Sequence, residues 1–374
     1  MEASVRAVLI NFNQNTHAMA TTNPTSPLSK TVQLLLLFIL VTVVLYYSKA
    51  LLIPIAFAGL LAMVLLPLNR WLEKKKMKRI WAVLLSTVVF ILGVVGVIWL
   101  VSWQIGNVAS DAFMMEGKLE EIIQSIQQMI KDTLGISKQM QEQMVQQNKE
   151  KGAATVGKGL VGVAGYIWTF LIDFVLVAVY LFLFLYYRSH IKKFILNVSA
   201  FGHKDKTENA LEQSTQVGQQ YLTGLSLMIL CLWVMYGVAF SIIGVKYALF
   251  FAILCGLLEM IPFVGNLTGT TLTVLFSLSQ GADVRMVIAI IVTYALVQFI
   301  QTYLIEPLVV GAKVNINPLF TILVLVAGEM VWGIPGLVLA IPLLAILKII
   351  FDHFEPLKPY GELIGEVKKK KMKK

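Results

Sequence analysis

The fold is decided by two long apolar stretches, ALFFAILCGLLEMIPFVGNLTGTTLTVLFSL (residues 248–278) and PLFTILVLVAGEMVWGIPGLVLAIPLLAILKII (residues 318–350). Each stretch is interrupted at its centre by Pro and Gly, and each carries a Glu-Met pair just before the interruption. Proline removes a backbone donor and glycine permits a sharp reversal of the chain. We therefore expect two helical hairpins, over residues 246–280 and 318–350.

All four arms of these hairpins are expected to be short, and the first arms are too short to cross a membrane. Residues 246–260 and 319–332 contain 15 and 14 residues, so as helices they reach roughly 21 to 22 Å against a hydrocarbon core of about 30 Å. Interrupted backbone is tolerated at membrane depth only where it faces protein or a water-filled cavity. Paired interrupted segments are typical of the binding sites of secondary transporters, so the hairpins predict a transport site.

The composition of the chain is that of an integral membrane protein. Of 374 residues, 57% are hydrophobic and only 14% are charged, and the mean hydropathy is +0.77. Apolar windows long enough to cross occupy residues 31–47, 50–68, 80–103, 160–187, 221–243 and 283–303. The predicted fold is all-α: a polytopic membrane protein with about six full transmembrane helices, two helical hairpins and amphipathic extramembrane helices.

The positive charge is concentrated in alternate connections. The net charge is +10, and the basic residues gather in residues 69–79, in residues 188–206 and at the C-terminus. This distribution is the positive-inside pattern, so we expect both termini and these two loops in the cytoplasm. It also argues against nucleic acid as the partner of the basic residues.

The chain is predicted to have six regions. Residues 112–150 carry apolar residues at helical spacing, including Leu119, Ile122, Ile126 and Ile130, which indicates an amphipathic helix. This helix is expected to pack on neighbouring spans or lipid, or between subunits. The regions are a disordered N-terminal tail (1–30), three transmembrane helices (31–103), an extracytoplasmic amphipathic helical loop (104–159), a fourth transmembrane helix with a cytoplasmic helical arm (160–220), the transport region (221–355) and a basic cytoplasmic tail (356–374).

Four carboxylates lie within or beside the apolar windows: Asp173, Glu259, Glu306 and Glu329. A charge at mid-bilayer costs on the order of 2.5 to 3.5 kcal/mol, so each needs a partner, a proton or a function. An internal ion pair, a helix cap or a neutral carboxylic acid would each satisfy this need. All four are candidate ion or proton carriers.

The hairpin tips and the segments beside them supply the candidate substrate-binding residues. The turns expose backbone N–H and C=O groups, and the helix that begins after a turn directs its positive end toward the tip. Amide, hydroxyl and free backbone groups suit a small neutral polar solute. The candidates are Glu259, Pro262, Gly265, Asn266, Thr268, Gln298, Gln301, Glu306, Asn315, Asn317, Glu329, Trp332, Gly333, Pro335 and Gly336.

The sequence carries no catalytic pattern. It has no phosphate-binding P-loop, no HExxH motif and no arrangement typical of a serine protease. Its four histidines are scattered without metal-ligand spacing, and Cys231 and Cys255 lie alone in apolar windows. We expect no enzyme activity, no cofactor and no metal.

A series of short motifs resembles the autoinducer-2 exporter family, also called the PerM-like permeases. The motifs are GVxYAL (244–249), IPxxG (261–265), EP (306–307), NPL (317–319) and GxxGxxxAxP (333–342). The resemblance implies a bacterial cell-membrane permease whose two hairpins contact the substrate, assembled as a homopentamer with an elevator-like movement in each protomer. Asn266 and Glu329 depart from the residues common in the family, so the cargo of this protein can differ from that of its relatives.

Three functions remain open at this point. The leading hypothesis is a secondary transporter that exports a small polar metabolite such as the quorum-sensing signal autoinducer-2. The alternative is a sodium–proton antiporter that uses the intramembrane carboxylates. A third hypothesis is a membrane scaffold organised by the extramembrane helices. The cargo, the coupling ion and the direction of transport are not given by the sequence.

Overall fold

The prediction of an all-α membrane protein is confirmed by the structure, a computed structural model that describes residues 27–113, 171–199, 204–261, 264–309 and 316–366. These residues form helices and contain no β-strand, and one isolated bridge joins Ile316 to Gly365. The helices are α2 (Pro27–Tyr47), α3 (Lys49–Lys74), α4 (Arg79–Phe113), the helix Leu171–Val198, α7 (Lys204–Ile243), α8 (Ala248–Leu258), α9 (Val264–Ser279), α10 (Val284–Ile300), the π-helix Gln301–Ile305, α11 (Glu306–Val309), α12 (Pro318–Trp332), α13 (Ile334–His353) and α14 (Lys358–Ile364).

Six helices in the described part of the chain are long and apolar enough to cross a membrane: Lys49–Lys74, Arg79–Gln104, Leu171–Val198, Lys204–Ile243, Val284–Ile305 and Ile334–His353. Five of them overlap predicted spans, although residues 160–170 of the span predicted over 160–187 lie outside the described residues. The predicted span over residues 31–47 lies in α2, which is not among the six. The sixth is α13, and this corrects the expectation that every hairpin arm is short. Its 20 residues reach about 30 Å, because the apolar run continues beyond Pro342 without a break.

The chain divides into two compact units, Met1–Ala50 and Leu51–Lys374. Within the first unit, α2 is apolar around its whole circumference, and side chains such as Phe38 are largely exposed. A helix of this kind is suited to lipid. The predicted tail over residues 1–30 lies outside the described residues up to residue 26, and its last residues begin α2.

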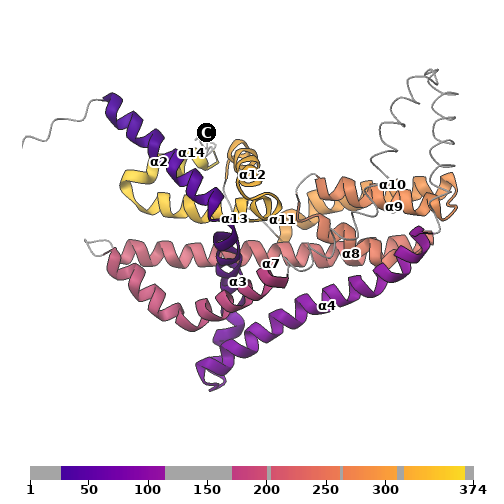
Figure 1. Cartoon of the computed structure of the whole chain (residues 1–374), viewed down its shortest axis with the longest axis horizontal. Coiled ribbons are helices and arrows are strands. Elements are labelled where there is room, and N and C mark those ends of the chain that lie inside the picture. Colours follow the sequence, from indigo (N-terminus) through magenta and orange to yellow (C-terminus); the bar gives the residue numbers. More distant parts are fainter. Residues whose placement is uncertain (1–26, 114–170, 200–203, 262–263, 310–315, 367–374) are drawn as a thin grey trace, which may run out of the picture. The chain divides into compact units, whose positions relative to one another are not determined.

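Within the second unit, the long helix α7 packs against both hairpins, against α8 of the first and α13 of the second (Figure 1). It has 40 residues and is therefore about 60 Å long. Its C-terminal half packs against α8 and α10, and the core there includes Leu232, Tyr236, Phe240, Phe251 and Cys255. This half of α7 supports the first hairpin.

The N-terminal half of α7 packs against α13 through small residues. A Cβ atom on Gly218 would lie 2.7 Å from Sδ of Met63 on α3 and 3.9 Å from Cδ1 of Ile346 on α13. Gly218 therefore permits three helices to meet closely. The cytoplasmic arm predicted within residues 160–220 is helical on both sides of residues 200–203. An ion pair of 2.6 Å between Lys192 on the helix Leu171–Val198 and Glu208 on α7 joins the two parts.

Both predicted hairpins are present. In the first, a Cβ atom on Gly265 would lie 1.6 Å from the carbonyl oxygen of Leu258, so the start of α9 lies directly on the end of α8. In the second, Gly333 adopts φ 64° and ψ −142°, a conformation that favours glycine, and reverses the chain between α12 and α13. The amphipathic helix predicted in residues 112–150 lies outside the described residues, except that α4 continues to Phe113.

Candidate functional site

The structure brings together two predicted site residues that are 42 positions apart in the sequence, Glu259 and Gln301. Glu259 is the C-cap of α8, half-buried at the tip of the first hairpin. Gln301 begins the π-helix and is only 4% exposed. Its Nε2 atom donates a hydrogen bond of 2.7 Å to Oε1 of Glu259 and lies 3.8 Å from Sδ of Met228 on α7. This hydrogen bond fixes the glutamate at the hairpin tip.

Other polar side chains surround this pair. Tyr236 of α7, Cys255 of α8 and Tyr294 of α10 lie within electrostatic range of Glu259. The first two are almost completely buried, at 1% exposure each. Residues of α7 and α10 therefore lie near the hairpin tip.

The π-helix that positions Gln301 was missed by sequence reasoning. The backbone N–H of Glu306 donates to the carbonyl of Gln301, five residues earlier. The next residue, Pro307, has no N–H and disturbs the preceding helical turn, which explains a wider turn at this point. Short π-helices frequently occur at functional sites, so Glu-Pro at the end of an apolar span is a signal that could have located this one.

Four buried oxygen atoms in this region have no hydrogen-bond partner among the described residues. They are Thr270 Oγ1 and Ser277 Oγ on α9, Gln298 Oε1 on α10 and Gln301 Oε1 on the π-helix. A buried polar group without a partner costs about 1–3 kcal/mol. Such groups require an explanation, and a polar ligand or water that binds beside the hairpin would supply one.

The remaining candidates near the first hairpin have different surroundings. Gly265 is buried and serves the close approach of α8 and α9, whereas Thr268 is exposed. Glu306 starts α11 and is exposed, near Tyr221 of α7. Asn317 caps α12, since its Oδ1 accepts a hydrogen bond of 3.0 Å from the Leu319 amide. Pro262 and Asn315 lie outside the described residues, and so does the side chain of Asn266.

The predicted residues of the second hairpin lie near the chain reversal between α12 and α13. Glu329 is exposed on α12, while Trp332 and Pro335 are half-buried on either side of Gly333. Gly336 is buried against Gly328: a Cβ atom on Gly336 would lie 1.9 Å from the Gly328 carbonyl oxygen. These glycines set the spacing of α12 and α13, and the structure gives Glu329 no role in that contact.

The last candidate, Asp173, is exposed on the helix Leu171–Val198. Among the described residues, no group of three or more His, Cys, Asp or Glu side chains is placed to hold a metal ion. The candidate site with defined geometry is therefore the pair of Glu259 and Gln301.

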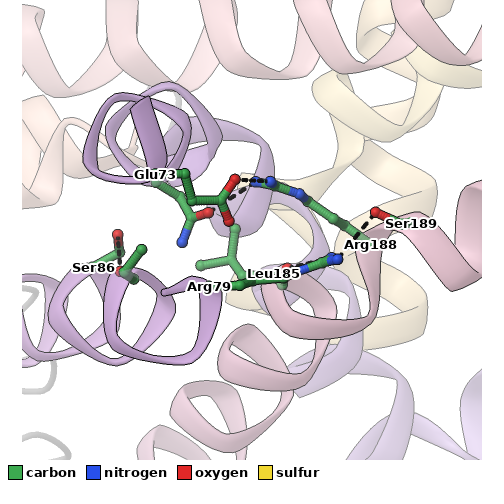
Figure 2. A network of polar contacts seen from close by, with 8 residues as sticks. Glu73, Arg79, Ser86, Leu185, Arg188 and Ser189 are labelled. Atoms are coloured by element: carbon green, nitrogen blue, oxygen red, sulfur yellow. Dashed lines mark hydrogen bonds and ion pairs between the residues drawn. The ribbon is translucent and has the colours of Figure 1, made fainter. Parts of the chain in front are cut away.

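A second polar network, shown in Figure 2, links three helices and was not recognised from the sequence. Arg188 forms an ion pair with Glu73 of α3, and its Nη1 donates to Oδ1 of Asn69 at 2.8 Å. Arg79, at the start of α4, donates to the Ser189 hydroxyl at 3.1 Å and to the Leu185 carbonyl at 3.4 Å. The basic runs were interpreted only as a topology signal, yet two of their arginines join these helices.

Replacement of Arg188 by Met is expected to destabilise the protein by about 2 kcal/mol, because the Glu73 carboxylate and the fully buried Asn69 lose their donor. The midpoint of thermal unfolding in detergent measures this effect. Lys192→Met is the matched control, since its ion pair with Glu208 is more exposed and should contribute under about 1 kcal/mol. Equal shifts in the two variants would contradict a structural role for the Arg188 network.

Comparison with known proteins identifies the relatives of this chain. The profile of the family described as AI-2E family transporter matches residues 35–355. The candidate transport protein YrrI of Bacillus subtilis (strain 168) is 24% identical over 352 residues, which cover 87% of this chain and 98% of YrrI. The candidate transport protein YueF of the same strain is 24% identical over 318 residues, or 82% of this chain and 84% of YueF. A candidate transport protein of Borreliella burgdorferi is 27% identical over 219 residues, or 55% of this chain and 60% of the relative.

Proposed function

The chain belongs to the AI-2E family of transporters, and from this premise we propose that it exports a small neutral polar solute by a secondary mechanism. The observation that carries the proposal is a set of four buried oxygen atoms, those of Thr270 and Ser277 in the first hairpin, Gln298 on α10 and Gln301 on the π-helix, which have no hydrogen-bond partner in the described part of the chain. Hydroxyl and amide oxygens accept hydrogen bonds from hydroxylated compounds, a class that includes autoinducer-2. An apolar drug would leave these atoms unpaired.

The packing of the first hairpin supports an elevator-like movement. A Cβ atom on Gly269 would lie 2.9 Å from Sγ of Cys255, and the Gly265 contact is closer still, so α8 and α9 are held together along their length. Helices packed this closely move as one rigid piece. We further propose that the protein acts in the cell membrane of a bacterium, as a homopentamer with both termini in the cytoplasm, with lipid around it.

Glu259→Gln tests this function in proteoliposomes that contain the purified protein. A glutamine at position 259 still accepts a hydrogen bond from Gln301, so flux of a neutral solute such as autoinducer-2 should stay within about threefold of the unchanged protein. Glu329→Gln should have as little effect. Solute release is measured by mass spectrometry, and an internal pH dye is followed in the same vesicles.

The pH dye separates this proposal from the antiporter hypothesis. Sodium-driven pH changes that disappear in Glu259→Gln or Glu329→Gln would overturn the proposed function and favour cation exchange. Solute flux in the unchanged protein without sodium-driven pH changes would support the proposal.

A further inference from the structure

An open pocket of about 650 Å³ lies beside the start of α4, away from the hairpin tips. Its basic residues are Lys78 just before α4, Arg79 at the start of α4, and His190 and Lys193 on the helix Leu171–Val198. No Asp or Glu among the described residues lines this pocket. The pocket therefore has three permanent positive charges at pH 7 and no acidic residue in its own wall to balance them.

Part of the pocket is held in place by the polar network of Figure 2. Arg79 donates to Ser189, another lining residue, so the guanidinium is fixed across the pocket rather than free in solvent. Its Nε atom is buried and has no partner in the described part of the chain. Because this atom is closed off from solvent, the fixed positive charge of Arg79 acts on a phosphate group together with Lys78 and Lys193.

The rest of the pocket lining is aromatic and apolar apart from Ser189. Tyr186, Tyr187 and Ile80 complete it, and Tyr187 and Ile80 are 49% and 47% exposed. Trp81, the next residue of α4, is 60% exposed. Exposed Tyr and Trp beside Lys and Arg at the end of a transmembrane helix are typical of the membrane interface, where lipid headgroups lie.

We propose that this pocket binds the phosphate of an anionic phospholipid headgroup, with the acyl chains along the apolar surface of α4. Basic pockets between transmembrane helices are known to accept such headgroups. The volume is sufficient for a glycerophosphate group, because ligand pockets generally occupy roughly 300 to 1,000 Å³. This proposal is independent of the solute that the hairpins carry.

The test measures the Kd of tail-labelled phosphatidylglycerol for the full-length protein in neutral detergent. In the double variant Lys78→Gln, Lys193→Gln, we expect the Kd to rise about 30-fold, the effect of losing two lysine–phosphate attractions. Phosphatidylcholine, which has no net charge, should bind weakly to both proteins. The matched control is Lys74→Gln, Lys358→Gln, which removes the same charge from exposed residues outside the pocket and should change the Kd by less than threefold.

Soluble glycerol 1-phosphate distinguishes a lipid from a free phosphate ester. If it displaces the labelled lipid only at concentrations at least a hundredfold above those of unlabelled phosphatidylglycerol, a lipid is the ligand. Equal competition would overturn the lipid assignment and identify a soluble phosphate ester as the ligand. An unchanged Kd in the pocket variant, or equal losses in the pocket and control variants, would overturn the site itself.

Discussion

Gln301→Leu is expected to reduce solute transport at least tenfold. Gln301 is 4% exposed and donates the 2.7 Å hydrogen bond that holds Glu259 at the hairpin tip. Leucine has a similar volume but no donor, so the half-buried carboxylate loses a hydrogen bond worth about 1.5–3 kcal/mol. The loss also removes an amide oxygen that we assign to the solute. Initial rates of solute release from proteoliposomes measure the effect.

Thr302→Val is the matched control for this prediction, because Thr302 is the next residue of the same π-helix and is exposed. Among the described residues, its hydroxyl accepts one hydrogen bond, of 3.3 Å, from Gln298. Transport by this variant should stay within about twofold, and both variants should elute as the same oligomer. A folded Gln301→Leu protein with unchanged transport would show that the Glu259 contact is not part of the transport site.

The hairpins could be predicted from the sequence because their signals are local. A cluster of Pro and Gly at the centre of an apolar stretch favours a break in the helix, and Gly333 adopts the expected reversal. The apolar periodicity also located most of the spans. The length of α13 was the exception, since Pro342 lies inside the helix in the structure although proline generally ends helices in water. In a membrane, neighbouring helices compensate for the lost backbone hydrogen bond.

The contacts at the site could not be predicted in the same way, because they join distant segments. Gln301 meets Glu259 only after α10 and the first hairpin pack on α7, and no spacing rule connects positions 42 residues apart. The ion pair of Arg188 with Glu73 is hidden for the same reason. Both arginines of that network stood in basic runs whose simplest explanation was topology. The sequence shows that polar residues in apolar helices need partners, but only the packing of the helices decides which residues those partners are.

Gly336→Ala is expected to destabilise the protein by about 3 kcal/mol and to abolish transport. The new methyl carbon would lie 1.9 Å from the Gly328 carbonyl oxygen and 3.0 Å from Cβ of Trp332. Both neighbours belong to α12, and a backbone oxygen cannot move without the helix. The two arms of the second hairpin must therefore separate, and overpacking of this kind costs about 1–3 kcal/mol or more. The midpoint of thermal unfolding and the rate of solute release measure the two effects.

Gly96→Ala separates a steric effect from the general effect of replacing a helical glycine. Gly96 lies within α4, and a Cβ atom added there would have no neighbour within 4 Å. Since alanine favours helix by roughly 0.5–1 kcal/mol over glycine, this control should keep or raise the thermal midpoint. A midpoint for Gly336→Ala equal to that of Gly96→Ala would mean that α12 and α13 are not held at the distance seen here. The two arms of the second hairpin would then need a looser packing than the Gly328–Gly336 contact described above.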